Sequence, residues 1–142
     1  MKDIEIREAL IKHFLTLNEF SGKPFITENN ANIALPNKNF TIPDNNVFFR
    51  LSFNPSEPDN IGMYNCDQQR YYGFFQIDIC VQKNKGLDDA DNRFKWICKL
   101  FKEGTSFDGI DIEKVYLATT SEEDNLYRTV VRVNFTADVI NE

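Results

Sequence analysis

The clearest alternation in the sequence is Arg70-Tyr71-Tyr72-Gly73-Phe74-Phe75-Gln76-Ile77-Asp78-Ile79-Cys80-Val81-Gln82. Every second residue from Phe75 to Val81 is apolar, whereas Gln76, Asp78 and Cys80 alternate with them. A period of two places the two sets on opposite faces of an extended chain. The run therefore predicts a strand with one face buried against helices.

Regular spacing of apolar residues recurs on both sides of this run. Outward from it, the sequence predicts further strands at Val47–Phe53, Ile112–Thr119 and Tyr127–Val139. Amphipathic periodicity predicts a helix over Ile4–Leu17, and a second helix starts at the acidic Asp88-Asp89-Ala90-Asp91 and stops before Gly104. We expect the buried stripe of the second helix to contain Ala90, Phe94, Ile97, Cys98 and Phe101, widened by Trp96 and Leu100.

This element order predicts one α+β domain over residues 1–142. Its antiparallel sheet has four strands, or five if the short apolar island Ile33-Ala34-Leu35 adds an edge strand, and its two main helices pack on one face. A chain of 142 residues, 42% of them hydrophobic and 13 of them Phe, is large enough to bury a core without staples.

Asn54–Gln69 is a long polar connection between two predicted strands, and its length points to a functional or mobile segment. Ile61, Met63 and Tyr64 place apolar side chains near its tip. We expect the segment to be mobile in an isolated subunit and to become ordered against a neighbouring subunit or another partner.

Charge and cysteine content limit the class of protein. The net charge of −6 argues against wrapping nucleic acid, although DNA could pass such a surface without sticking. Cys66, Cys80 and Cys98 are widely spaced, which favours free thiols in a reducing cytoplasm. The N-terminus lacks the pattern of a signal peptide and no apolar run is long enough to span a bilayer, so we expect a soluble protein made in the cytoplasm.

The sequence offers little for catalysis, cofactors or metals. His13 is the only histidine and falls on the polar side of the first helix, where we expect a solvated residue. The acidic groups at Asp88–Asp91 and Glu122-Glu123-Asp124 are expected to be a charged helix start and a solvated turn. No Asp or Glu stands two residues before a Lys, as restriction-type nucleases require, so a metal-dependent nuclease has only Asp78 and these acidic groups in its favour.

Aromatic side chains opposite the main apolar rows form the candidate interface. Phe48 and Phe74 fall on this opposite face, together with Tyr72 and Val130. Either loops of the same chain cover these side chains, or they form a subunit interface.

Four features in sequence order resemble a known family. They are the first helix followed by Leu35-Pro36-Asn37-Lys38-Asn39-Phe40-Thr41-Ile42-Pro43, a strand with Phe49-Arg50-Leu51, the run Gly73–Ile79 followed by Gly86 and a helix, and the helix end Leu100-Phe101-Lys102-Glu103-Gly104. In this order they resemble the tail terminator (minor tail protein U-like) family of long-tailed bacteriophages, from about Ile4 to Val139. Leu35 stands where that family usually has an aromatic residue.

The resemblance implies a virion protein of the phage tail or neck, without catalysis. It implies a self-assembled ring, usually a hexamer, that caps the tail tube protein, ends tail polymerisation and offers a docking surface to a head-completion protein, while DNA passes through without specific binding. A head-tail connector of the same fold and an accessory binding module without ring symmetry stay open as alternatives.

Overall fold

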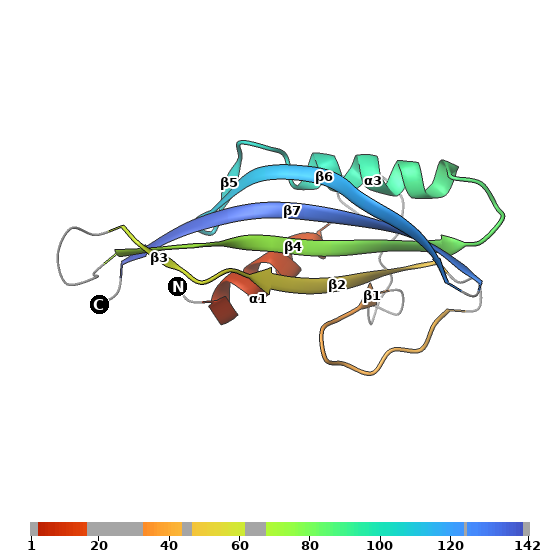
Figure 1. The fold of residues 1–142 in the computed structure, drawn as a ribbon, viewed down its shortest axis with the longest axis horizontal. Helices are drawn as coiled ribbons and strands as arrows, with labels where there is room; N and C mark the ends of the chain where they lie inside the picture. The colour runs from red at the N-terminus through yellow and green to blue at the C-terminus, as the bar shows by residue number, and fades with distance from the viewer. Residues whose placement is uncertain (1–2, 17–32, 44–46, 62–67, 124, 141–142) are drawn as a thin grey trace.

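One curved sheet, covered on one face by two helices, makes up most of the described chain (Figure 1). The computed structural model describes residues 3–16, 33–43, 47–61, 68–123 and 125–140. Within them, the helices are α1 (Asp3–Phe14) and α3 (Asp88–Leu100). The strands are β1 (Ile33–Ala34), β2 (Phe48–Pro55), β3 (Asp59–Asn60), β4 (Gln68–Gln82), β5 (Ser106–Phe107), β6 (Ile110–Glu123) and β7 (Leu126–Ile140).

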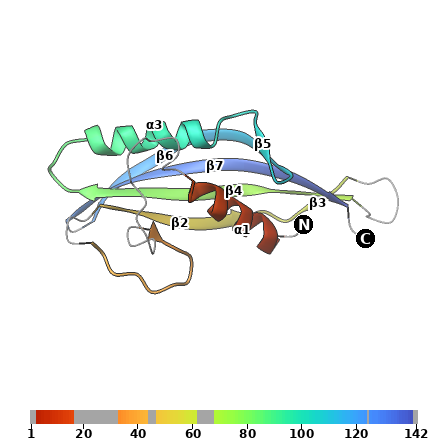
Figure 2. The same ribbon diagram turned by 180° about the vertical axis from the view of Figure 1, so that it is seen from behind.

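The strand order is β1-β2-β4-β7-β6-β5, and β3 pairs with β4 beside the end of β2. β1 runs parallel to β2, and the other pairings are antiparallel. The prediction of a four- or five-stranded antiparallel sheet is therefore wrong, because the described sheet is mixed and has seven strands. The broader α+β prediction agrees with this architecture, since the helices and the sheet form separate layers (Figure 2).

The strands that the sequence did not predict are very short. β3 and β5 each contain two residues, too few to show any period. β5 joins β6 through Asp108-Gly109, both with positive φ (48° and 79°), which is the backbone of a tight two-residue hairpin turn. The Asp-Gly pair was thus a usable hairpin signal.

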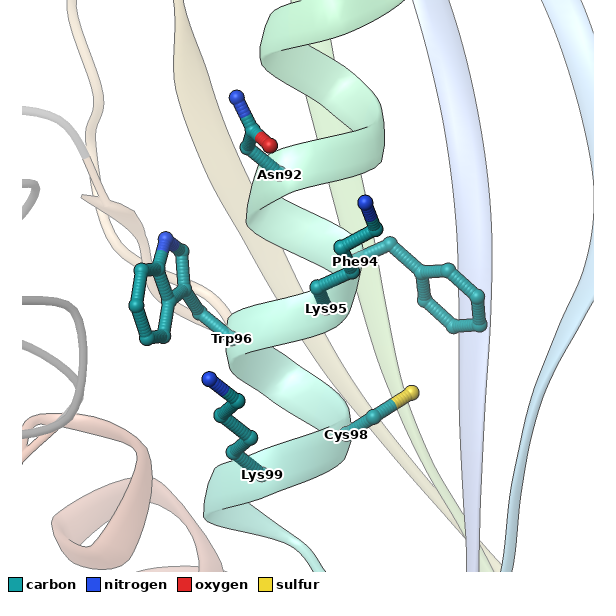
Figure 3. A pocket seen from close by; sticks show the side chains of 6 residues that line it. All are labelled: Asn92, Phe94, Lys95, Trp96, Cys98 and Lys99. Carbon is teal, nitrogen blue, oxygen red and sulfur yellow. The ribbon is translucent and has the colours of Figure 1, made fainter.

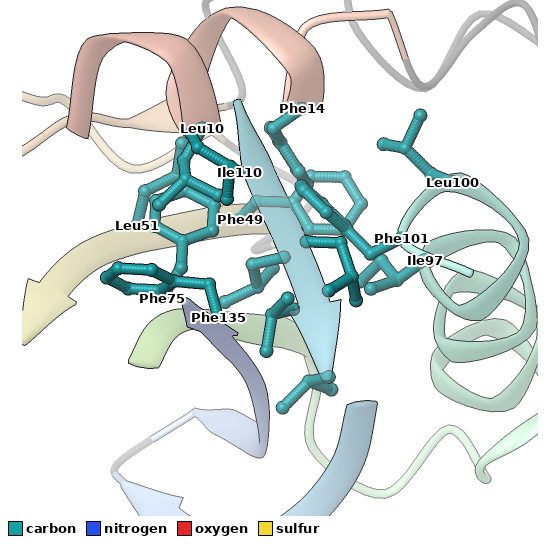
Figure 4. Close-up of a cluster of buried hydrophobic side chains, with 14 of the residues drawn as sticks. Leu10, Phe14, Phe49, Leu51, Phe75, Ile97, Leu100, Phe101, Ile110 and Phe135 are labelled. Carbon is teal, nitrogen blue, oxygen red and sulfur yellow. The ribbon is translucent and has the colours of Figure 1, made fainter. Parts of the chain in front are cut away.

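The core lies between the sheet and the two helices (Figure 4). α1 contributes Ile6, Leu10 and Phe14, spaced one helical turn apart and fully buried. The sheet contributes the alternating rows that the sequence predicted, and the rings of Phe14 and Phe49 meet edge to face with centroids 5.2 Å apart. The period-two pattern thus identified the face of the sheet that the helices cover.

The buried side of α3 differs from the prediction. Its fully buried residues are Ala90, Arg93, Ile97 and Leu100, whereas Phe94 and Cys98 are only half buried. Arg93 is 7% exposed, lies 5.0 Å from the centroid of the Phe49 ring and pairs with Asp89 at 3.0 Å. The predicted stripe did not include Arg93 and did include Phe94 and Cys98, whereas Ala90, Ile97, Leu100 and Phe101 are buried as predicted.

The polar connection Asn54–Gln69 is structured where it is described. Asn54 and Pro55 end β2, and Asp59 and Asn60 pair with Arg70 and Gln69 of β4. The amide of Ile61 donates to the carbonyl of Gln68 at 3.0 Å. These described residues therefore pair with β4, while the mobility of the connection in an isolated subunit stays a prediction. Met63, Tyr64 and Cys66 lie outside the described residues.

Gly73 makes the close approach of β2 to β4 possible. It has φ +151°, and a Cβ atom at this position would lie 2.4 Å from the Asn54 carbonyl oxygen. The amide of Ser56 donates to the carbonyl of Tyr72 at 2.8 Å beside this contact. Only glycine fits here without moving the backbone of the neighbouring strand.

Candidate interaction surface on the outer face of the sheet

The outer face is the side of β2, β4, β7 and β6 turned away from the helices. Strand register brings four of the six arginines in the sequence to this face. Its main side chains are Phe48, Arg50, Arg70, Tyr72, Phe74, Gln76, Asp78, Cys80, Lys114, Tyr116, Arg128, Val130, Arg132, Asn134 and Asp138.

One end of the outer face is covered by the chain itself. Phe48 is fully buried, and its ring centroid lies 5.1 Å from that of Phe40. Val130 and Cys80 are buried as well, and burial raises the pKa of the Cys80 thiol to about 12. Phe48 and Val130 therefore share the predicted face, but within this chain they are internal residues.

Asp78 is the buried charge of this covered end, at 3% exposure. Gln76 Nε2 donates to its Oδ1 at 2.9 Å, and Arg128 Nη1 lies 3.6 Å from its Oδ2. Arg128 also approaches Glu123 at 3.6 Å and donates to Ser121 Oγ at 3.1 Å. Burial raises the pKa of Asp78, and the Gln76 hydrogen bond and the Arg128 charge offset only part of that effect.

The other end of the outer face is partly open. Tyr72 and Phe74 are half buried, and the guanidinium of Arg132 lies 4.6 Å from the centroid of the Phe74 ring. Arg132 stands opposite Tyr116 of β6, whose ring lies 5.4 Å from Lys114 Nζ. Of the predicted interface residues, the structure thus brings Tyr72 and Phe74 together on one open surface. Ile61 is half buried beyond β3, and Met63 and Tyr64 lie outside the described residues.

The helix layer carries a shallow pocket of about 290 Å³ on α3 (Figure 3). Trp96 and Lys99 point to one side of the helix, and Phe94 and Cys98 point to the other. Lys99 Nζ lies 4.4 Å from the centroid of the Trp96 ring, and burial raises the pKa of the Cys98 thiol. Cys98 and Cys80 are both free thiols.

His13 is not the solvated residue that the sequence suggested. Its ring stacks on Phe107 with centroids 3.9 Å apart and meets Phe101 edge to face at 5.2 Å. Its Nε2 hydrogen-bonds the carbonyl oxygen of Leu100 at 3.0 Å. His13 therefore ties α1 to the end of α3 and to β5, where the helical wheel alone could not place it.

Acidic and sulfur-bearing side chains do not converge in the described part of the chain. No group of three or more His, Cys, Asp or Glu there could hold a metal ion. Asp78, the residue in favour of a nuclease, has Gln76 and Arg128 as its neighbours.

Comparison with known proteins then identifies the family. A sequence profile of the phage tail terminator protein family matches residues 5–135. The chain belongs to the phage tail terminator family. This confirms the resemblance drawn from the order of the sequence features and assigns the protein to phage tail assembly.

Structural comparison supports the fold alone. One solved structure, of a protein whose name gives no function, superposes over 100% of this chain and 99% of its own with a TM-score of 0.70 and 17% identity. No curated protein matches this tail terminator significantly. Within its described residues, neither helix is long and apolar enough to cross a membrane.

Proposed function

We propose that this tail terminator closes into a ring, expected to be a hexamer, that caps the tail tube. The ring ends tube polymerisation and presents a docking surface to the head-completion protein, and DNA passes through it without specific binding. The observation that carries the proposal is the family match over residues 5–135, which spans both described helices and nearly all of the sheet. Such a role needs complementary surfaces and no catalytic group.

The open end of the outer face supports self-association. Half-buried aromatic and arginine side chains are enriched where proteins meet, and Tyr72, Phe74 and Arg132 are of this kind. Ile61 lies near them in sequence beyond β3, and Met63 and Tyr64 follow it. We place the ring or tube contact on Tyr72, Phe74, Ile61, Met63 and Tyr64; Phe48 contributes only through the internal packing of the chain.

The edge of the sheet supports the same proposal. Ile110 and Asp111 of β6 pair with β5, Ile112 exchanges backbone hydrogen bonds with Gly104 and Thr105, and the amide of Val115 donates to Glu103 Oε1. Beyond Val115, no described strand pairs with this edge of β6. Irregular pairing between Ile112 and Lys114 and between Leu117 and Thr119 bends this edge. Bends of this kind oppose uncontrolled strand pairing and restrict an edge to a partner of matching shape.

Native mass spectrometry and sedimentation velocity test the ring directly. The protein alone, and the protein mixed with tail tube protein, should give a closed oligomer of one size, and electron microscopy should show tubes that stop growing when it is added. A monomer that neither self-associates nor arrests tubes would refute the proposal. A one-to-one complex with a partner would favour an accessory binding module instead.

The double substitution Met63→Ser with Tyr64→Ser tests the loop assignment. If these side chains contact a partner, their replacement should weaken ring formation or tube capping and should leave the thermal midpoint of the subunit nearly unchanged. Unfolding of the subunit with normal assembly at permissive temperature would show that these residues belong to its own core.

A further inference from the structure

A cluster of stacked cations and rings occupies the open end of the outer face. We define the cation–aromatic cluster as Tyr72, Phe74, Lys114, Tyr116 and Arg132. Arg132 stands over the Phe74 ring and opposite Tyr116, and Lys114 lies over Tyr116. Rings on β4 and β6, the two neighbours of β7, thus hold two cations against the sheet.

Arg132 has an unmet hydrogen-bonding need. Its Nε is buried and has no hydrogen-bond partner among the described residues. Its neighbours differ, since Arg70 binds Asp138 through two hydrogen bonds and Arg128 approaches Asp78 and Glu123. A buried donor without an acceptor costs free energy, but the buried Nε is itself out of reach of a second molecule. A carboxylate from outside would be bound by the terminal Nη groups of the planar guanidinium, which the Phe74 ring holds in place.

The expected partner is a protein carboxylate and not nucleic acid. Asp78, Glu123 and Asp138 share the outer face, so it lacks the dense positive charge that holds a phosphate backbone. The net charge of −6 also disfavours binding to nucleic acid. A short acidic segment beside an apolar side chain would match both the cations and the exposed parts of the rings.

The first turn of α3 is such a segment. Leu87 is 49% exposed, and Asp88 and Asp91 are exposed and form no ion pair within the described residues. Asp89, by contrast, pairs with Arg93 of its own helix. This turn belongs to the helix layer, on the side of the sheet opposite the cluster (Figures 1 and 2).

We propose that the cation–aromatic cluster of one subunit binds the first turn of α3 of a second copy. Asp88 and Asp91 of that copy accept hydrogen bonds from Arg132 and Lys114. Leu87 of that copy packs on Phe74 and Tyr72. The proposal rests on the proposed ring and supplies it with a contact.

The two surfaces differ, so the contact is head to tail. Each subunit offers one cluster and one acidic turn, and repetition of such a contact closes a ring or extends a filament. Because the contact depends on charge and the subunits carry like net charge, raised salt should weaken the ion pairs but screen the overall repulsion.

A charge exchange between two variants tests this pairing. Variant one carries Arg132→Glu, and variant two carries Asp88→Arg with Asp91→Arg. Each alone should associate at least about thirtyfold more weakly than the natural chain, as expected for a central ion-pairing residue. A one-to-one mixture should regain the full oligomer with the variants alternating, because each face then meets a turn of opposite charge.

Two controls keep the result interpretable. Lys102→Glu makes the same charge change as Lys114→Glu at an exposed position just after α3, and it should leave association unchanged. If Arg132→Glu unfolds the subunit, Lys114→Glu replaces it as the test, because Lys114 is the exposed member of the cluster and its substitution should also weaken association. Circular dichroism and the thermal midpoint show which variants are folded.

Each outcome has a distinct meaning. If the natural chain forms rings and both variants do the same, the cluster contact is wrong and the ring stands. If the variants are monomeric and folded but their mixture does not assemble, the acidic turn is not the occupant, and the cluster contacts another part of the second copy. A natural chain that stays monomeric with tail tube protein present would refute the contact and the ring together.

Discussion

The two faces of the sheet arise from the same alternation of residues, but they differ in composition and in burial. The helix-covered face is mainly apolar, with Phe75, Ile77 and Val133 fully buried. The outer face alternates with it but carries four arginines, and its burial changes from one end to the other. Asp78 and Cys80 are buried at one end, whereas Tyr72 and Phe74 are half exposed at the other.

The difference separates stability from recognition. On the helix-covered face, apolar burial drives folding and tolerates little change in volume. On the outer face, polar and charged groups contribute less to stability, because much of their interaction replaces contacts with water. Substitutions on the two faces should therefore separate in unfolding and in association measurements.

Adjacent phenylalanines give the largest contrast. Phe75→Ala removes a fully buried ring from the core and should lower the free energy of unfolding by about 3–5 kcal/mol. Phe74→Ala removes a half-buried ring under Arg132 and should cost about 1–2 kcal/mol. Urea unfolding of both variants measures the difference; equal losses would show that the outer face is packed like the core.

Gly73→Ala tests the close approach of β2 to β4. The new Cβ would clash with the Asn54 carbonyl and force β2 away from β4, at a cost of about 1–3 kcal/mol. Gly104→Ala is the matched control, because its φ is also positive (+81°) but nothing lies within 4 Å of the added Cβ. If both variants lose the same stability, the backbone conformation and not the close approach of the strands decides the effect.

The sequence predicted the elements that repeat a period over many residues. The helix-covered rows of β2, β4 and β7 and the faces of Phe74 and Tyr72 followed from alternation alone. The two-residue strands had no period to show, and β5 was marked only by Asp108-Gly109. Pattern therefore identifies the face of a residue well and the number of strands poorly.

Burial of polar side chains could not be predicted because it depends on distant partners. Arg93 lies in the core beside the ring of Phe49 and pairs with Asp89. His13 is half buried against Phe101, Phe107 and the carbonyl of Leu100. Phe48 was rightly assigned to the outer face, but its cover by Phe40 comes from a segment without a periodic pattern. The sites of such residues follow from tertiary packing, which local sequence does not encode.

Asp78→Asn tests the charge buried at the covered end. Burial raises the pKa of Asp78, so the folded state binds its proton more tightly than the unfolded state does. The contribution of Asp78 to stability therefore falls as pH rises from the ordinary carboxyl value through the raised one. Asparagine mimics the protonated acid, so the variant should be more stable than the natural chain at neutral pH and equal to it in acid. Urea midpoints across pH measure the difference; a variant less stable at neutral pH would show that Arg128 overcompensates for burial.

The smallest effect is expected at the exposed pair Arg70–Asp138. Two hydrogen bonds at 2.8 and 3.1 Å join these side chains across β4 and β7, and they lower the pKa of Asp138. A lowered carboxyl pKa means that the stabilisation is present at neutral pH and is lost as pH falls through the lowered value. Asp138→Asn should therefore lower the thermal midpoint slightly at neutral pH in low salt, and the difference should disappear in acid.

The response to salt should distinguish the exposed pair Arg70–Asp138 from the buried Asp78. Both partners are more than 40% exposed, so high salt should screen their attraction and reduce the effect of Asp138→Asn. Asp78 lies at 3% exposure, and the effect of Asp78→Asn should respond much less to salt. Thermal midpoints of the two variants in low and high salt, each compared with the natural chain, measure this contrast. An equal salt response at Asp78 and Asp138 would mean that water reaches both ends of the outer face alike, and the division of that face into a covered and an open end would be wrong.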